Sequence, residues 1–402
     1  MKIDAYAVIM ICGAIDGFGH NSVFAAEIDS ALAEFNIAAR IIDYRLDFGK
    51  IRESLEDDNC LFFICFNGFG SELSLAGSQP GDFYSAFQYF NKNIFDLMHD
   101  LPTHEAMSHQ AKIRFPRRYL LSTDFGYVQE AHELDIHNVR YTPSITFPRT
   151  QAQMRTKGKQ DRSKFRRRGI QWLLPVQLPP PSSVRQRLAS ARSYRGAILK
   201  QIFESVSEAC ISDLKLDLRV ETRRACREIG LLFDAFNPDH RFLMTAIADL
   251  VKFERRRRLL EGLKGLPITV LTSDISGERS GGFDYLPART FKELLALMME
   301  SEAVICPLPH HTGFHERAMG AFSGGAAVLA APNAVLESEF VDGRDFLSYQ
   351  SIGELVELIG RFSEDPEALH AIAESGRERA HARFSPNRLV EVIVSLAQVY
   401  RK

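Results

Sequence analysis

Residues 303–330 read AVICPLPHHTGFHERAMGAFSGGAAVLA, and this stretch indicates the fold class of the chain. It begins with an apolar run of strand length, passes through a polar loop and enters a helix-favouring segment near His315. Paired glycines, Gly324 and Gly325, end that segment before a second apolar run, Ala326 to Ala330. Two buried strands joined by a helix are the repeating unit of a parallel sheet covered by helices, so we expect an α/β fold.

The rest of the second half shows the same rhythm. Gly169 to Val176 and Ile268 to Leu271 are predicted strands, and Ala246 to Leu263 is a predicted long helix. We expect the run Arg255 to Arg258 to point outward on this helix, because charge runs usually form solvated faces; a phosphate contact is the alternative. Ser385-Pro386 predicts the start of a final helix, with proline at the first helical position.

The first 150 residues repeat strand, loop and helix. Tyr6 to Cys12 is an apolar run typical of a parallel strand buried on both faces, and the glycine-rich loop Gly13 to His20 follows it. Five further strands are predicted at Ala38–Asp43, Leu61–Phe66, Ile94–Met98, Tyr119–Ser122 and Val139–Thr142. The chain therefore contains two parallel-sheet halves.

Composition sets the wider limits. A chain of 402 residues favours two domains, and 45% apolar with 25% charged residues excludes disordered, collagen-like and coiled-coil proteins. The apolar run Ala5 to Cys12 is too short for a membrane span and lacks a signal-peptide cleavage pattern. Six scattered cysteines without ligand-like spacing indicate a reducing, cytoplasmic location, and a net charge of −2 gives no general attraction to nucleic acid.

One segment departs from this balance. Residues 149–168 hold nine Lys or Arg and a single acid, Asp161. A solvated linker is the plainer interpretation. Alternatively, this basic segment binds a phosphate-rich or lipid-linked substrate and makes a peripheral contact with a membrane.

Two loops are candidates for chemistry, because ligands of parallel sheets bind beyond the carboxyl ends of the strands. The first is Gly13 to His20, where Gly17 and Gly19 allow close approach of the backbone to an acceptor and His20 stands at the helix entrance. The loop departs from the GxGxxG fingerprint, so it supports NAD only weakly. A glycine turn with a structural histidine is the alternative.

The second loop, at residues 307–314, leads into a charged helix start. Arg317 and the helix N–H groups could bind a diphosphate, and Glu316 could accept hydrogen bonds from sugar hydroxyls. Thr312, Gly313 and His315 complete the expected donor site. We expect no metal, because His310 and His311 are adjacent and no carboxylate spacing completes a ligand set.

Residues 303–384 resemble the C-terminal, nucleotide-sugar-binding domain of GT-B glycosyltransferases, in particular the group-one branch that includes spore-maturation-protein-like enzymes. The likeness lies in the order of short motifs: Glu316-Arg317 at a helix start, Gly343-Arg344-Asp345-Phe346 in a loop and Gly376-Arg377-Glu378-Arg379 in a closing helix. Phe283 to Ala288 is also similar. In the first half only Asp100 to His104 resembles the branch's Asp-x-Pro element.

The resemblance implies two Rossmann-like domains facing a cleft: residues 1–165 on the acceptor side, residues 166–384 on the nucleotide-sugar side, and a final helix at 385–402 that could cross back. It implies transfer of a sugar from a nucleotide sugar to a hydroxyl of a glycan, lipid or protein, in polysaccharide or glycoconjugate biosynthesis, with no cofactor beyond the donor. A GT-B-like epimerase or phosphorylase, or a noncatalytic nucleotide-sugar-binding protein, are the alternatives.

The implied site residues lie at strand ends. His20 and Asp100 are the candidate bases, with His104 beside the acceptor. Ser273, Asp274, Tyr285 and Leu286 would contact the nucleotide, although turn and packing roles account for them equally well. One departure stands out, because many retaining members carry a second glutamate where this chain has Gly320. Ribose recognition must then differ, and the retaining stereochemistry does not carry over.

Overall fold

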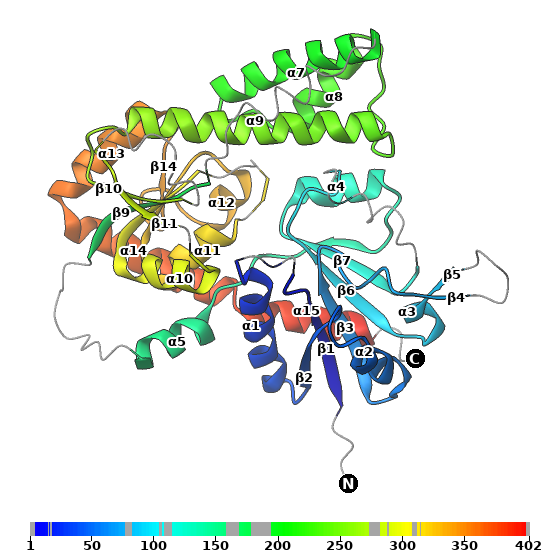
Figure 1. Ribbon diagram of the computed structural model, residues 1–402. Coiled ribbons are helices and arrows are strands. Elements are labelled where there is room, and N and C mark those ends of the chain that lie inside the picture. Colours follow the sequence, from blue (N-terminus) through cyan, green and yellow to red (C-terminus); the bar gives the residue numbers. More distant parts are fainter. Residues whose placement is uncertain are drawn as a thin grey trace. The chain divides into compact units, whose positions relative to one another are not determined.

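The computed structural model describes residues 5–14, 16, 18–76, 83–103, 107, 115–157, 169–177, 194–272, 282–287, 289–307, 312–313 and 315–398. The chain divides into two compact units. Unit 1 comprises Met1–Gln160, Thr290–Lys292 and Ala382–Lys402, and unit 2 comprises Asp161–Arg289 and Glu293–His381. Each unit contains its own six-stranded parallel sheet (Figure 1), which confirms the predicted α/β fold class.

The sheet of unit 1 has the strand order β2-β1-β3-β6-β7-β8. Its strands are β1 (Tyr6–Ile11), β2 (Ala38–Asp43), β3 (Cys60–Phe66), β6 (Asn93–Met98), β7 (Arg118–Ser122) and β8 (Val139–Tyr141). A separate antiparallel pair joins β4 (Ser74–Ala76) to β5 (Phe83–Ser85). The flanking helices are α1 (His20–Glu34), α2 (Phe48–Glu56), α3 (Ala86–Tyr89), α4 (Phe125–Glu133), α5 (Pro148–Lys157) and α15 (Pro386–Gln398).

The apolar strands form the centre of this sheet because both of their faces are covered. Strand β3 reads CLFFICF, and all of its residues except Leu61 are buried. On one face, Phe63 and Cys65 pack with Val8, Met10 and residues of α2 and α3. The predicted strands of the first half are confirmed with small differences at their ends.

The C-terminal segment belongs to unit 1. Helix α15 packs against α1, and just before it the backbone N–H of Thr146 donates to the carbonyl of Phe384 at 2.7 Å. The final helix therefore does return to the first sheet. Buried apolar residues of α15, Leu389, Val390 and Ile393, face this packing, as the apolar stripe of the sequence requires.

The sheet of unit 2 has the order β11-β10-β9-β12-β13-β14. Its strands are β9 (Ile170–Pro175), β10 (Ile268–Thr272), β11 (Asp284–Pro287), β12 (Ser301–Cys306), β13 (Ala327–Ala330) and β14 (Leu347–Ser348). Its helices are α7 (Tyr194–Ser212), α8 (Leu218–Glu228), α9 (Pro238–Gly262), α10 (Phe291–Glu300), α11 (Glu316–Gly324), α12 (Ala334–Glu339), α13 (Ile352–Glu364) and α14 (Pro366–Arg383). The strand order reverses direction between β9 and β12, which defines the switch point of this sheet.

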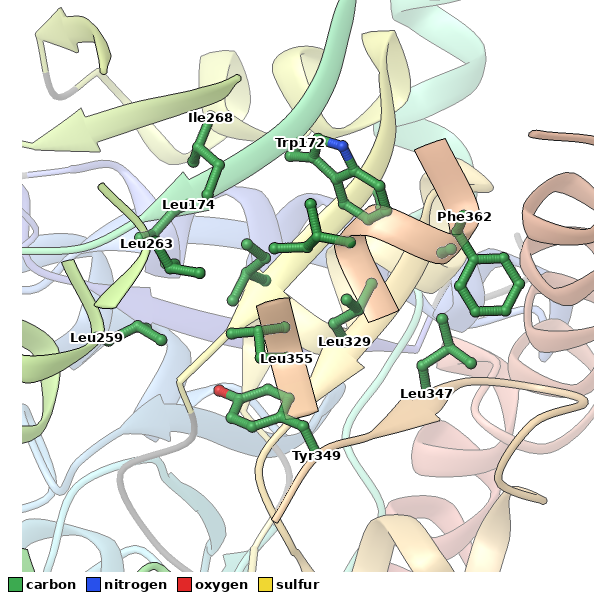
Figure 2. Close-up of a cluster of buried hydrophobic side chains, with 14 of the residues drawn as sticks. Trp172, Leu174, Leu259, Leu263, Ile268, Leu329, Leu347, Tyr349, Leu355 and Phe362 are labelled. Carbon is green, nitrogen blue, oxygen red and sulfur yellow. The ribbon is translucent and has the colours of Figure 1, made fainter. Parts of the chain in front are cut away.

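A continuous apolar core covers one face of this sheet. Figure 2 shows Trp172 and Leu174 of β9 together with Leu329 of β13 and residues of α9 and α13. Trp172 is fully buried. The helices α9 and α13 contact each other and both contribute side chains to this core.

Helix α9 corrects one expectation. It begins at Pro238, earlier than predicted, because Asn237 caps it by accepting a hydrogen bond from the N–H of Asp239 and proline occupies the first position. The expected outward face of Arg255 to Arg258 is wrong for Arg256, which is only 4% exposed, whereas Arg257 and Arg258 are exposed as expected. The helix lies between α7 and the sheet, so parts of that run face protein on both sides.

Among the described residues, no helix has the length and apolar character that crossing a membrane requires.

Candidate active site

The start of α11 lies at the switch point of unit 2. His315 caps this helix, because its Nδ1 accepts a hydrogen bond from the backbone N–H of Arg317 at 3.2 Å. The same nitrogen lies 3.1 Å from a carboxylate oxygen of Glu316. Nδ1 cannot both accept from the backbone and donate to the carboxylate, so only one of these two contacts is a hydrogen bond at a time.

Arg317 joins the two strands on either side of the switch point. Its side chain extends from the first turn of α11, after β12, and its Nη1 donates to the carbonyl of Pro175 at the end of β9, at 3.1 Å. The guanidinium is half-buried. A fixed cation beside a helix N-terminus is a favourable arrangement for an anion.

The other predicted donor residues of this loop are held by side chains that sequence reasoning missed. Arg219 at the start of α8 donates to the hydroxyl of Thr312 while it pairs with Asp217. Asn333 donates to the carbonyl of Gly313 at 2.9 Å and also caps α12. Neither partner had a sequence signal beyond a possible helix cap, because both lie far from the loop along the chain.

Tyr285 and Leu286 lie on the edge strand β11. Strand β11 is two strands away from β9, which places them about 10 Å from the carbonyl that Arg317 contacts. Tyr285 also packs against the apolar core of the sheet, and burial raises the pKa of its hydroxyl. The predicted residues Ser273 and Asp274 lie outside the described residues.

Gly320 occupies the position of the missing second glutamate, and side chains of α10 leave no room for a larger residue there. A Cβ added to Gly320 would lie 2.7 Å from Cδ2 of Leu295 and 3.1 Å from Sδ of Met298, both on α10. Gly320 therefore faces the neighbouring helix. A glutamate there would have to displace the side chains of Leu295 and Met298 before it could meet a ribose.

The two glycine-arginine motifs of the family resemblance meet in the interior of unit 2. Asp345 accepts hydrogen bonds from the backbone N–H of Val341 at 2.9 Å and from the hydroxyl of Ser375 at 2.6 Å, and its carboxylate pairs with Arg344. Gly376 lies so close that a Cβ would meet the carbonyl of Asp345 at 2.2 Å. These motifs therefore fasten α14 to the loop before β14, a structural role.

In unit 1, His20 lies in an aromatic cluster at the start of α1. Its ring centroid is 4.5 Å from that of Phe24, 4.8 Å from Phe291 and 5.2 Å from His99. Its Nδ1 lies 3.4 Å from the side-chain oxygen of Asn21, and its Nε2 is buried with no hydrogen-bond partner. Sequence reasoning missed His99, which follows β6 and comes next to His20 only through the sheet.

Asp100 stands beside this cluster and is exposed. The side-chain amide of Asn67 donates to its carboxylate at 2.7 Å, and the oxygen of the same amide accepts from the backbone N–H of His99 at 2.8 Å. Asn67 directly follows β3 and has φ of 52°. The structure thus gathers His20, His99, Asn67 and Asp100 at one carboxyl edge of the sheet.

Two glycines of the loop Gly13 to His20 have local structural roles. Gly19 precedes α1 with φ of 70°, a left-handed conformation that favours glycine. The backbone N–H of Gly13 donates to Asp43 at 2.8 Å, and this hydrogen bond keeps the pKa of that carboxyl below its usual value. Gly17 and His104 lie outside the described residues.

Only the start of the basic segment falls within the structure. Arg149 is the second residue of α5, and its guanidinium pairs with Asp29 of α1 at 2.7 Å. That arginine is therefore a packing contact. Residues 158–168 lie outside the described residues.

In the described ranges, no group of three His, Cys, Asp or Glu side chains could hold a metal ion.

Comparisons with known proteins agree with this architecture. Residues 255–395 match the family model described as glycosyl transferase-like. The structure is similar to HepE from Anabaena in complex with UDP-glucose, with a TM-score of 0.51 and 10% identity over 97% of this chain and 99% of that one. It is also similar to the DNA-modifying enzyme β-glucosyltransferase, with a TM-score of 0.51 and 9% identity over 98% and 99%. No curated protein matches the sequence.

At such low identity the solved structures show the fold alone, and that fold is GT-B. The family match covers residues 255–395 of the 402. The predicted GT-B fold is thereby confirmed, and the likeness to glycosyl transferases lies in that C-terminal part of the chain.

Proposed function

We propose that unit 2 binds the donor with its diphosphate at the start of α11 and its base toward β11. The position of Arg317, beside a helix N-terminus and tied to β9 across the switch point, is the observation that carries this proposal. Thr312, Gly313, His315 and Glu316 surround the diphosphate and sugar, and Tyr285 and Leu286 lie on the base side. Ser273 and Asp274 remain donor candidates from the sequence.

The proposed role of the donor site follows from the negative charge that develops on the leaving group. When the glycosidic bond to the donor breaks, the nucleoside diphosphate leaves with added negative charge on its phosphate oxygens. A guanidinium and a helix dipole that are already oriented stabilise this charge without reorganisation. We therefore propose turnover without a metal ion and without a cofactor beyond the donor.

We further propose that unit 1 binds the acceptor and provides the base. His20 and Asp100 remain the candidates, with Gly17, Gly19 and His104 near the acceptor. Support for Asp100 comes from its exposure and its fixed contact with Asn67, while the buried Nε2 of His20 is surrounded by aromatic rings. An inverting reaction needs such a base, whereas a retaining reaction does not.

The acceptor class belongs to the proposal as well. Two proteins with this fold are described with UDP-glucose or uridine diphosphoglucose, and one of them modifies DNA. This chain has a net charge of −2 and therefore lacks the basic surplus of a DNA-binding protein, so a glycan, lipid or protein hydroxyl is the acceptor we propose. The six cysteines are free and buried, which supports a reducing, cytoplasmic location.

Titration of UDP into the wild-type protein and into Arg317→Ala tests the donor site. Loss of one charge-assisted contact is expected to weaken binding by about 1.5–3 kcal/mol. Arg257→Ala is the matched control, because Arg257 is exposed and pairs with Glu254 and Glu261 on its own helix. Equal affinity of a folded Arg317→Ala variant would remove Arg317 from the donor site.

Incubation with the donor alone identifies an epimerase, and incubation with donor and acceptor separates the other two alternatives. A glycosyltransferase without acceptor leaves UDP-glucose intact or slowly hydrolyses it, whereas an epimerase yields a rearranged nucleotide sugar. A noncatalytic protein binds without turnover in the presence of any acceptor. Product analysis by NMR distinguishes the three outcomes.

A further inference from the structure

Unit 2 contains a cavity of about 250 Å³ that the proposed donor site does not use. Helix α9 lines one side with four cations: Lys252, Arg255, Arg256 and Arg258. The opposite wall is formed where β12, β13 and β14 end and α13 begins, and it includes Ala331, Tyr349 and Ile352. No Asp or Glu is among the described residues that line it, so positive charge dominates the space.

Arg256 is the unusual member of this group. It is 4% exposed, its Nη1 donates to the carbonyl of Gln177 at 3.0 Å, and its Nε is buried without a hydrogen-bond partner. Two equally buried arginines differ from it, because Arg118 pairs with Asp96 and Arg219 with Asp217. A buried guanidinium with a single hydrogen bond and no paired carboxylate is costly, since its charge is removed from water and only the more distant charges of Glu316 and Asp249 offset that loss.

The lowered pKa of Arg256 reflects the cost of burying its charge. Burial, and after it the nearby charge of Arg317, lowers the pKa of Arg256 to about 9. An anion in the cavity would remove the penalty by supplying the missing acceptors. An arginine kept in this state is the arrangement expected where a ligand completes the site.

The guanidinium of Arg255 is also oriented so that it could bind an anion in the cavity. Its Nε donates to the carbonyl of Cys210 at 2.8 Å, and its Nη2 donates to the carbonyl of Asp213 at 2.9 Å, both near the end of α7. These contacts fix the guanidinium at the cavity wall and leave Nη1 without a hydrogen-bond partner. Lys252 differs, because it is paired with Asp249 at 3.1 Å.

We propose that this cavity binds the phosphoryl group of a small phosphate monoester, at a site separate from the donor. Planar guanidinium groups hold phosphate oxygens in pairs, and the start of α13 adds the positive end of a helix dipole. The apolar side chains Leu259, Ala331 and Ile352 would contact the ester's carbon skeleton. Cavities for drug-sized ligands measure roughly 300–1,000 Å³, so this one is too small for a complete nucleotide sugar.

Calorimetric titration of phenyl phosphate into the full chain tests the proposal. We expect binding to the wild type and an affinity at least ~10-fold lower in Arg256→Met, which keeps an unbranched side chain but removes the charge. Arg257→Met is the matched control, because this neighbouring arginine does not line the cavity. No binding of phenyl phosphate to the wild type, or equal affinity in Arg256→Met, would overturn the proposal.

Three further measurements separate this site from the donor site and from a general anion site. Arg317→Ala should bind phenyl phosphate as the wild type does even where it loses UDP, and saturating UDP should not displace phenyl phosphate. Competition between the two ligands would overturn the separate site. Benzoate should bind at least ~10-fold more weakly than phenyl phosphate, since a carboxylate has fewer oxygens and less charge; equal affinity would overturn the choice of phosphate.

Discussion

His20 and Asp100 lie at the same edge of one sheet, yet they meet different requirements for a general base. A base must present an accepting atom to the acceptor hydroxyl. The Nε2 atom of His20 is buried among aromatic rings, so the ring would have to turn before it could accept a proton. Asp100 is exposed, and the side-chain amide of Asn67 donates to its carboxylate at 2.7 Å, so it can be reached by an acceptor without a rearrangement of the cluster.

Exchange of Asp100 for asparagine should therefore lower turnover by roughly 10²- to 10⁴-fold, as expected for loss of a general base. His20→Ala should lower it by less than ~10-fold, because that ring mainly fills the aromatic cluster. Steady-state rates with a saturating donor measure both effects, and UDP affinity should stay unchanged in both variants. A dead His20→Ala beside an active Asp100→Asn would assign the base to His20 instead.

Gly320 carries a second prediction at the level of a single residue. Gly320→Glu should destabilise the protein by roughly 3 kcal/mol or more, because the new side chain overlaps Leu295 and brings a charge into the contact between α10 and α11. Urea denaturation measures the free energy of unfolding. Gly360→Glu is the control, since the space around Gly360 on α13 is open. A stable Gly320→Glu variant with tighter UDP binding would show that a ribose contact is possible here.

At the scale of elements, the contact between α14 and the loop before β14 supports the carboxyl edge of unit 2. Asp345 is its centre and is 1% exposed. Hydrogen bonds from Arg344, Ser375 and the backbone of Val341 outweigh the effect of burial and lower the pKa of this carboxyl to about 2. The loop and the helix are thus joined through one ionised side chain.

Asp345→Asn should cost about 1–3 kcal/mol of unfolding free energy at neutral pH. Because the folded pKa lies below the unfolded value, the stabilisation is fully present above about pH 4 and is lost as the pH falls toward 2. Denaturant melts between pH 2 and 7 should show the difference between wild type and variant shrinking over that range. A difference that stays constant down to pH 2 would contradict the ionised state of Asp345.

At the scale of the whole molecule, the two sheets divide the work that a sugar transfer requires. In our proposal unit 2 stabilises the leaving diphosphate and unit 1 activates the acceptor. In the same proposal, Arg317 and the start of α11 take the place that a divalent metal has in other transferases. The wild-type enzyme should therefore keep its turnover in EDTA, measured with UDP-glucose or whichever donor proves active. Complete loss of activity, restored by Mg²⁺ or Mn²⁺, would contradict this prediction.

The sequence by itself determined the two parallel sheets and the helix start at Glu316-Arg317, and it predicted the class of enzyme. These features are local, since apolar runs, paired glycines and short motifs report directly on the residues that contain them. The tertiary structure decided which distant side chains meet. Arg219 contacts Thr312 from 93 positions away, and His99 lies beside His20 only because β1 and β6 end at one edge of the same sheet.

The run Arg255 to Arg258 shows the physical reason most clearly. Four adjacent basic residues on a helix predict a solvated face, because each charge alone prefers water. Only the packing of α9 between α7 and the sheet turned Arg256 inward and gave the cavity its charge. Burial depends on what covers a residue, and the covering elements lie elsewhere in the chain, so no reading of the run itself could have predicted it.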